Sequence, residues 1–145
     1  MLALASDHAG YPLKEQIKAH LIARGVEFTD FGTSSVDSVN YVDYAKKACQ
    51  AVMSGQCEKA LLLCGTGIGM SIAANKHKGI RAAVASDSFS VRLTRMHNDA
   101  NVLCLGQRVV GAGLACDLVD LFIDTEFEGG RHAERVCAVM AIENE

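Results

Sequence analysis

The sequence predicts an α/β fold, a three-layer doubly wound domain with a parallel sheet of about five strands. Short apolar runs alternate along the whole chain with longer segments in which apolar residues recur at helical spacing. This alternation is typical of repeated right-handed β-α-β units, which place helices on both faces of a parallel sheet. The 145 residues, 50% of them hydrophobic, suffice for one sizeable core. We therefore expect a single domain over residues 1–145.

The predicted elements alternate in type along the chain. Strands are expected at 1–5, 26–31, 60–64, 80–85 and 102–105. Helices are expected from Pro12 up to Gly25, over 41–52, after the third strand to about 75, and at 88–96. Two further helices close the chain, one carrying Leu114, Leu118 and Leu121 and one beginning at about Arg131.

Spacing and helix-end residues support these elements. Leu13, Ile17 and Leu21 recur every four residues after Pro12, which favours a first helical position, and Gly25 is typical of a helix end. The run ALLLC at 60–64 is apolar throughout, as strands covered on both faces are. The last helix is expected to bury Val136, Val139 and Met140.

Composition excludes several classes of partner. Seventeen acidic and fourteen basic residues give a formal charge of -3, without the basic excess typical of proteins that bind nucleic acid or anionic membranes. No apolar run approaches the ~20 residues of a membrane span, and the first residues do not form a secretion signal. The six cysteines contain no C-x-x-C pair, so neither a disulfide framework nor a zinc site is expected. We expect a cytoplasmic protein.

Ligands bind open α/β sheets where strands end and the following helices begin. Three such loops are polar or rich in glycine: SDHAG at 6–10, CGTGIG at 64–69 and GQR at 106–108. Glycines at 65, 67 and 69 match neither the G-x-G-x-x-G fingerprint nor a Walker A loop. They fit a nest of backbone N–H donors for a phosphate or an oxyanion, and equally a tight turn with close helix packing.

Several polar side chains are candidates for chemistry. Cys64 precedes the glycine loop, where a helix N-terminus favours a thiolate, although a buried core cysteine fits as well. Asp7-His8 and His97-Asn98-Asp99 pair an imidazole with a carboxylate. His20, His77 and His132 are interpreted as surface or capping residues. Arg131 and Arg135 lie four apart on one helical face, where they would repel each other unless a phosphate or the neighbouring glutamates Glu128 and Glu134 neutralise them.

Long motifs in one order over the whole chain resemble a known family. These are SDHAG at 6–10, NYVDYA at 40–45, CGTGIGMSIAANK at 64–76, MHNDANVLCLGQRVVG at 96–111 and FEGGRHAERV at 127–136. The chain resembles the type B ribose-5-phosphate isomerases and the related galactose-6-phosphate and allose-6-phosphate isomerases. The resemblance implies an aldose-ketose isomerase, an intramolecular oxidoreductase of the pentose phosphate pathway, that uses no cofactor and no metal.

The same resemblance implies roles for individual residues. Cys64 would be the base that moves a proton between C1 and C2 of an open-chain sugar phosphate, His97 would open the furanose ring, and Thr66 would shuttle a proton between O1 and O2. Substrate contacts are implied for Asp7, His8, Tyr41, Gly65, Thr66, Gly67, Ile68, Gly69, Asn98, Arg108, Arg131 and Arg135.

Two positions qualify these implications. The family commonly has Asp-Tyr-Pro where this chain has Asn40-Tyr41-Val42, so a fixed backbone φ is lost beside Tyr41. Some relatives use a glutamate several residues after the cysteine position as the base. Here Ala73 and Ala74 offer no acid, which favours Cys64.

The motifs leave the substrate open. Ribose 5-phosphate and ribulose 5-phosphate are expected, and allose 6-phosphate or galactose 6-phosphate is the alternative, because pocket depth decides between five and six carbons. Two further hypotheses are a phosphosugar-binding module without turnover and the non-catalytic partner chain of a heteromeric galactose-6-phosphate isomerase.

Chain direction predicts the assembly. Helices of this fold run antiparallel to the strands, so the helix at 88–96 should return His97 to the edge of the sheet opposite Cys64. If both act on one sugar, the simplest arrangement is that His97 comes from a second subunit. We therefore expect a homodimer with two shared sites, or a tetramer of four chains, and the resemblance implies sites at a dimer interface.

Overall fold

A five-stranded parallel sheet forms the centre of the computed structural model, which describes residues 1–145. The strand order is β2-β1-β3-β5-β4, and all neighbours run parallel. The strands are β1 (Leu2–Ser6), β2 (Phe28–Asp30), β3 (Lys59–Cys64), β4 (Ala82–Val84) and β5 (Val102–Gly106). The prediction of an α/β fold with about five parallel strands is confirmed.

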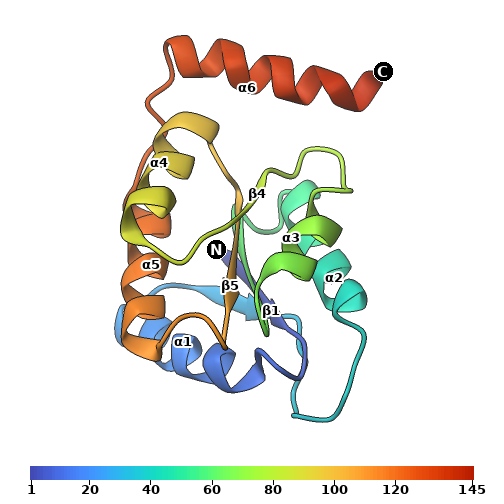
Figure 1. Ribbon diagram of the computed structural model, residues 1–145, viewed down its shortest axis with the longest axis vertical. Helices are drawn as coiled ribbons and strands as arrows, with labels where there is room; N and C mark the ends of the chain where they lie inside the picture. The colour runs from blue at the N-terminus through green and yellow to red at the C-terminus, as the bar shows by residue number, and fades with distance from the viewer.

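Helices cover both faces of this sheet (Figure 1). They are α1 (Tyr11–Ala23), α2 (Tyr41–Met53), α3 (Ile68–Ala74), α4 (Ser88–Asn98), α5 (Ala112–Asp124) and α6 (Arg131–Ala141), with a short 3-10 turn at Ile142–Asn144. Helices α1, α4 and α5 pack on one face, and α2 and α3 pack on the other.

Alternation along the strands builds a core on each side of the sheet. In β1, Leu2 and Leu4 pack toward α1 and α5, whereas Ala3 and Ala5 pack toward α2. In β3, Leu61 and Leu63 likewise pack toward α1 and α5, and Leu62 and Cys64 pack toward α2 and α3. Because both faces are covered, β1, β3 and β5 are buried almost along their whole length, and this frame holds the loops at the carboxyl edge.

Element ends differ from the sequence expectation by a few residues. Helix α1 begins at Tyr11, so Pro12 occupies its second position, where its missing N–H costs no helical hydrogen bond. Strands β2 and β4 are shorter than expected because they lie at the two edges of the sheet. Helix α4 runs to Asn98, which places His97 in its last turn.

Helix α6 lies outside the three layers, across one end of the molecule (Figure 1). Its main contacts within the chain are with α4 and with the turn that follows it. The expectation that α6 buries its apolar face is wrong for this chain alone. Val139 is 56% exposed, and Val136 and Met140 are only half-buried, because a cavity separates this face of α6 from the residues before and in β4. None of the helices has the length and apolar character needed to cross a membrane.

Candidate active site

The carboxyl ends of β1, β3 and β5 bring the three expected loops together. Asp7 N–H donates to the carbonyl of Leu63, and Gln107 N–H donates to the carbonyl of Cys64. The guanidinium of Arg108 lies over Gly65, where a β-carbon would approach it to 3.1 Å. The structure therefore gathers Asp7, Cys64 and Arg108 at one edge of the sheet.

The thiol of Cys64 is enclosed by the glycine loop that follows it. Its side chain is buried, with 6% of the residue exposed, and Sγ accepts the N–H of Gly67 at 3.0 Å. Gly67 has φ +80°, a left-handed conformation that side chains rarely adopt, and a β-carbon there would meet the backbone of Leu105 at 3.0 Å. The turn is thus tight, and it also aims a backbone donor at the sulfur.

Three donors of the same loop stay free. The N–H groups of Gly65, Thr66 and Gly69 make no hydrogen bond within the chain, while Ile68 N–H donates to Thr66 Oγ1 at 3.2 Å. Free N–H groups beside a thiol at a helix start provide donors for an oxyanion. The loop therefore combines both alternatives that the sequence left open, a close-packed turn and a set of backbone donors.

Two further glycines, Gly10 and Gly106, permit this close approach of the loops. A β-carbon at Gly106 would lie 2.6 Å from Cα of Thr66, and one at Gly10 would lie 2.5 Å from the backbone of Leu63. Neither glycine has a positive φ, so the requirement is for space. A sequence signal existed, since Gly106 ends an apolar strand run and Gly10 lies in the loop after one, but close approach is a tertiary property.

The loop after β1 presents an acid and an imidazole. Asp7 is buried, and its Oδ1 accepts the N–H of Gly10 at 2.9 Å. Nδ1 of His8 accepts the N–H of Val39 at 3.2 Å. A neutral His8 therefore carries its proton on Nε2.

Tyr41 is held in place without the proline that the family commonly has next to it. Asn40 caps α2, and its Oδ1 accepts the N–H of Val42 at 3.1 Å, a donor that proline would lack. The ring of Tyr41 covers Gly69, whose β-carbon would meet it at 3.0 Å. Tyr41 thus reaches the glycine loop.

The remaining predicted residues lie at the opposite edge of the sheet. Cys64 pairs with Gly106 at the end of β5, whereas α4 ends at Asn98, just before β5 begins. The two edges are separated by the five residues of β5, or about 16 Å at ~3.3 Å per residue. Within one chain, His97 and Asn98 therefore do not reach Cys64.

Two buried or half-buried arginines fix the end of α4. Arg95 donates to Asp99 Oδ1 at 2.9 Å, and Arg81 donates to Asp99 Oδ2 at 3.0 Å and to the carbonyl of Asn98 at 3.2 Å. Asp99 itself has φ +46°, which ends the helix. These contacts hold the last turn, and with it His97, in one position.

The arginines of α6 lie beside that turn without partners of their own. Arg131 and Arg135 form no ion pair within the chain, so the expected alternative pairing with Glu128 and Glu134 is not present. Arg135, His97 and Asn98 line a cavity of about 530 Å³ between α6 and the body. Two unpaired guanidinium groups at a helix N-terminus are suited to bind an anion.

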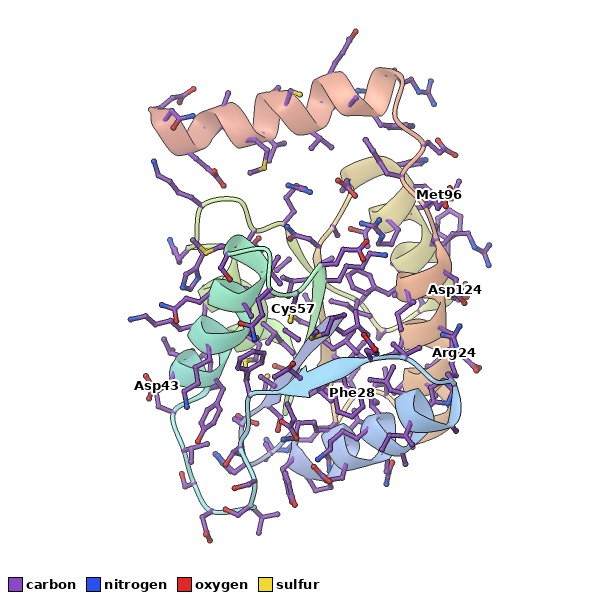
Figure 2. All side chains as sticks on the ribbon, turned by 180° about the vertical axis from the view of Figure 1, so that it is seen from behind. Arg24, Phe28, Asp43, Cys57, Met96 and Asp124 are labelled. Carbon is purple, nitrogen blue, oxygen red and sulfur yellow. The ribbon has the colours of Figure 1, made fainter.

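A glycine pair brings α6 to this place. Gly129 and Gly130 have φ +65° and +55°, and both conformations favour glycine. Glu128 N–H donates to the carbonyl of Met96 at 3.1 Å, and Figure 2 shows Met96 beside the segment that leads into α6. The turn therefore begins against the end of α4.

His132 contradicts its interpretation as a surface residue. It is buried, and its ring stacks on that of His97 with centroids 4.1 Å apart and planes 10° apart. With Glu128, the two rings place three possible metal ligands within 4.8 Å. An imidazole nitrogen binds a metal in its ring plane, and parallel planes share no such point, so the geometry is that of a stacked pair.

Known proteins are similar to this chain over nearly its whole length. The family model described as Ribose/Galactose Isomerase matches residues 2–139. The chain belongs to the ribose/galactose isomerase family. It is 50% identical to ribose-5-phosphate isomerase B of Escherichia coli over 142 residues, which covers 98% of this chain and 95% of that one. A putative sugar phosphate isomerase of Bacillus subtilis is 47% identical, with 93% and 91% covered.

Solved structures of this isomerase family share the fold. The ribose-5-phosphate isomerase B of Clostridium thermocellum superposes with a TM-score of 0.97 at 52% identity, covering 99% of this chain and 97% of that one. The protein from Thermotoga maritima gives a TM-score of 0.94 at 49% identity, with 97% of each chain covered. The chain is an isomerase.

Proposed function

We propose that this isomerase interconverts ribose 5-phosphate and ribulose 5-phosphate through an enediolate, with Cys64 as the base. The observation that carries the proposal is the thiol of Cys64 inside a loop with free backbone donors, at the carboxyl edge of the sheet. The names of relatives up to 52% identical support the five-carbon substrate.

The proton transfer needs a base and donors that face one sugar carbonyl. The Cys64 thiolate takes the proton from C2 of the open-chain aldose. The electron pair of the broken C2–H bond forms the enediolate, and O1 of the enediolate accepts hydrogen bonds from backbone N–H groups of the loop. Thr66 moves a proton between O1 and O2, and the thiol returns its proton to C1. The proton lost from carbon is thus restored, and no cofactor is needed.

His97 is assigned to the opening of the furanose ring. As the C1–O4 bond breaks and the C1=O1 bond forms, one proton leaves O1 and one is gained by O4. An imidazole can accept the first and return the second. Arg131 and Arg135 would hold the phosphate, since neither has a partner in the chain.

A homodimer would bring these two groups together. Cys64 and His97 lie at opposite edges of the sheet, so one chain does not supply both to one sugar. The apolar face of α6 with Val139 is uncovered, as an interface helix would be. We infer that His97, Asn98, Arg131 and Arg135 of one protomer complete the site that contains Cys64 of its partner.

The test of this function is a panel of kcat/KM values for ribose 5-phosphate, allose 6-phosphate and galactose 6-phosphate. Ribose 5-phosphate is expected to lead. A hexose phosphate that leads by about tenfold, a full 1.4 kcal/mol, overturns the five-carbon assignment. The absence of turnover with every aldose phosphate would favour a phosphosugar-binding module or the non-catalytic chain of a heteromeric galactose-6-phosphate isomerase.

Cys64→Ala tests the base within the same panel. It is expected to remove nearly all turnover while the affinity for inorganic phosphate stays close to that of the wild type, because the thiol acts on carbon and the arginines bind phosphate. Cys49→Ala is the matched control, since Cys49 is also buried but belongs to the core. Retained turnover in Cys64→Ala refutes the assignment.

A further inference from the structure

The imidazole of His97 is backed by a second imidazole that the proposed chemistry does not use. The rings of His97 and His132 stack with centroids 4.1 Å apart and an interplanar angle of 10°. The His97 side chain is 35% exposed, whereas that of His132 is 8% exposed. An accessible ring therefore rests on a buried one that belongs to another helix.

Glu128 joins the two rings at their edges. Its Oε2 lies 3.4 Å from Nε2 of His132 and 3.8 Å from Nε2 of His97. Its backbone N–H is bonded to Met96, and the backbone N–H of His132 is bonded to the carbonyl of Gly129 at 3.0 Å. The buried ring is thus tied to the turn at 129–130, and the turn is tied to α4.

The state of His132 suits a stacking partner. Burial, and after it the neighbouring His97, lower the pKa of His132 below its ordinary value of 6.5. His132 is therefore neutral at pH 7, and a neutral ring stacks on His97 without charge repulsion whether or not His97 holds a proton.

The stacked ring of His132 restricts the orientation of the exposed His97 imidazole. Without it, the His97 side chain could turn about both of its side-chain bonds, since a third of it faces solvent. Acid-base catalysis requires a ring nitrogen within hydrogen-bond reach of the sugar oxygens. A misplacement of about 1 Å can cost about a hundredfold in rate.

We propose that His132 is a positioning residue that holds the imidazole plane of His97 for opening of the sugar ring. This inference rests on the proposed function, because it assigns ring opening to His97. It concerns the chemical step alone. Binding of the phosphate stays with Arg131 and Arg135, and proton transfer at carbon stays with Cys64.

Two apolar replacements separate stacking from simple filling of space. His132→Phe keeps a flat ring, and His132→Leu fills much of the same volume without one. In the full-length protein, His132→Leu is expected to lower kcat for ribose 5-phosphate by about tenfold to a hundredfold with KM within about twofold. His132→Phe is expected to recover most of the loss.

Two further measurements show which step is affected. Exchange of the C1 proton of ribulose 5-phosphate with D2O needs Cys64 but no ring opening, so it is expected to stay close to wild type in both variants. Inhibition by inorganic phosphate reports on the arginines and is also expected to stay unchanged. Exchange by the wild type, together with turnover of ribose 5-phosphate, establishes the proposed function independently of His132.

Each alternative has a distinct outcome. Equal kcat values for His132→Leu, His132→Phe and wild type overturn the inference, as does an equal loss in both variants. A raised KM and weaker phosphate inhibition with unchanged kcat would show that His132 places α6 and its arginines instead. A wild type that exchanges no C1 proton and turns over no ribose 5-phosphate contradicts the proposed function itself.

Discussion

At the scale of single residues, the site depends on charges and donors that the fold leaves without partners. Arg131 and Arg135 have no carboxylate within ion-pair distance, and three N–H groups of the glycine loop have no acceptor. The charged groups at the end of β2 are paired instead. Lys14, only 1% exposed, donates to Asp30 Oδ1 at 2.6 Å, and Lys18 contacts the second oxygen at 2.9 Å.

Removal of one arginine should affect binding more than folding. We expect Arg135→Ala to raise KM for the sugar phosphate by about tenfold or more, since a hydrogen bond between charged groups contributes about 1.5–3 kcal/mol. The melting temperature should change little, because no buried partner is left unpaired. Arg92→Ala, at another exposed and unpaired position, is the control. A large fall in melting temperature with unchanged KM would contradict a ligand-binding role.

The Asp30 carboxylate should make stability depend on pH. Burial raises its pKa, but hydrogen bonds from Lys14, Lys18 and the N–H of Gly32 outweigh burial, so the pKa lies below the ordinary 3.8. The stabilisation is complete above the unfolded-state value and is lost as pH falls through the lower folded-state value.

Asp30→Asn tests this dependence. It should reduce the free energy of unfolding at pH 7 by about 3 kcal/mol, because the buried Lys14 ammonium loses its anionic partner. The deficit should shrink as the pH is lowered below about 4 in urea denaturation series, since the wild-type carboxylate is then protonated too. Asp117→Asn, at an exposed unpaired position, should show no such trend. An equal deficit at every pH would argue against the charge.

At the scale of elements, helix ends place the functional groups. Asn40 starts α2 at Tyr41, Asp99 stops α4 directly after His97 and Asn98, and Gly129-Gly130 turns the chain into α6. Each of these helix ends is determined by local residues, but each fixes the position of a functional side chain. The helices themselves mainly supply apolar faces to the two cores.

The turn before α6 requires glycine at position 130. Gly130 has φ +55° and ψ -132°, so Gly130→Ala should cost about 1–3 kcal/mol in strain. We expect it to raise KM for the sugar phosphate as Arg131 and His132 shift. Gly113→Ala in the first turn of α5 is the control and should be neutral or slightly stabilising. Unchanged KM and melting temperature in Gly130→Ala would show that the turn tolerates side chains.

At the scale of the whole molecule, the predicted site residues of one chain lie at two opposite edges of the sheet. The thiol, the glycine loop and Arg108 lie at the carboxyl edge of the sheet, and His97 with the arginines of α6 lies at the other. The exposed apolar residues of α6 fit the proposal that a second protomer covers them.

Mixing two inactive variants tests this division. Cys64→Ala and His97→Asn, each without activity alone, should regain about a quarter of the wild-type rate after subunit exchange, because half of randomly formed dimers hold one intact site of two. Each variant exchanged with itself is the control. If both residues served one chain's site, every site would carry a lesion and no activity would return.

The alternation of apolar runs was enough to predict the layers and the parallel sheet. It depends on local spacing, which the sequence contains directly. Motif residues such as Cys64, Gly67 and Arg131 could likewise be named, because the turn and helix ends around them have local signals. The direction of α4 even indicated that His97 would emerge away from Cys64.

The tertiary structure alone decided the contacts between distant segments. The stack of His132 on His97, the space required at Gly106, and the uncovered face of α6 join residues that are far apart in sequence or depend on what packs nearby. Helical spacing showed that α6 has an apolar face but not whether its own chain covers it. That face stays exposed because α1, α4 and α5 already fill one side of the sheet, and α2 and α3 fill the other.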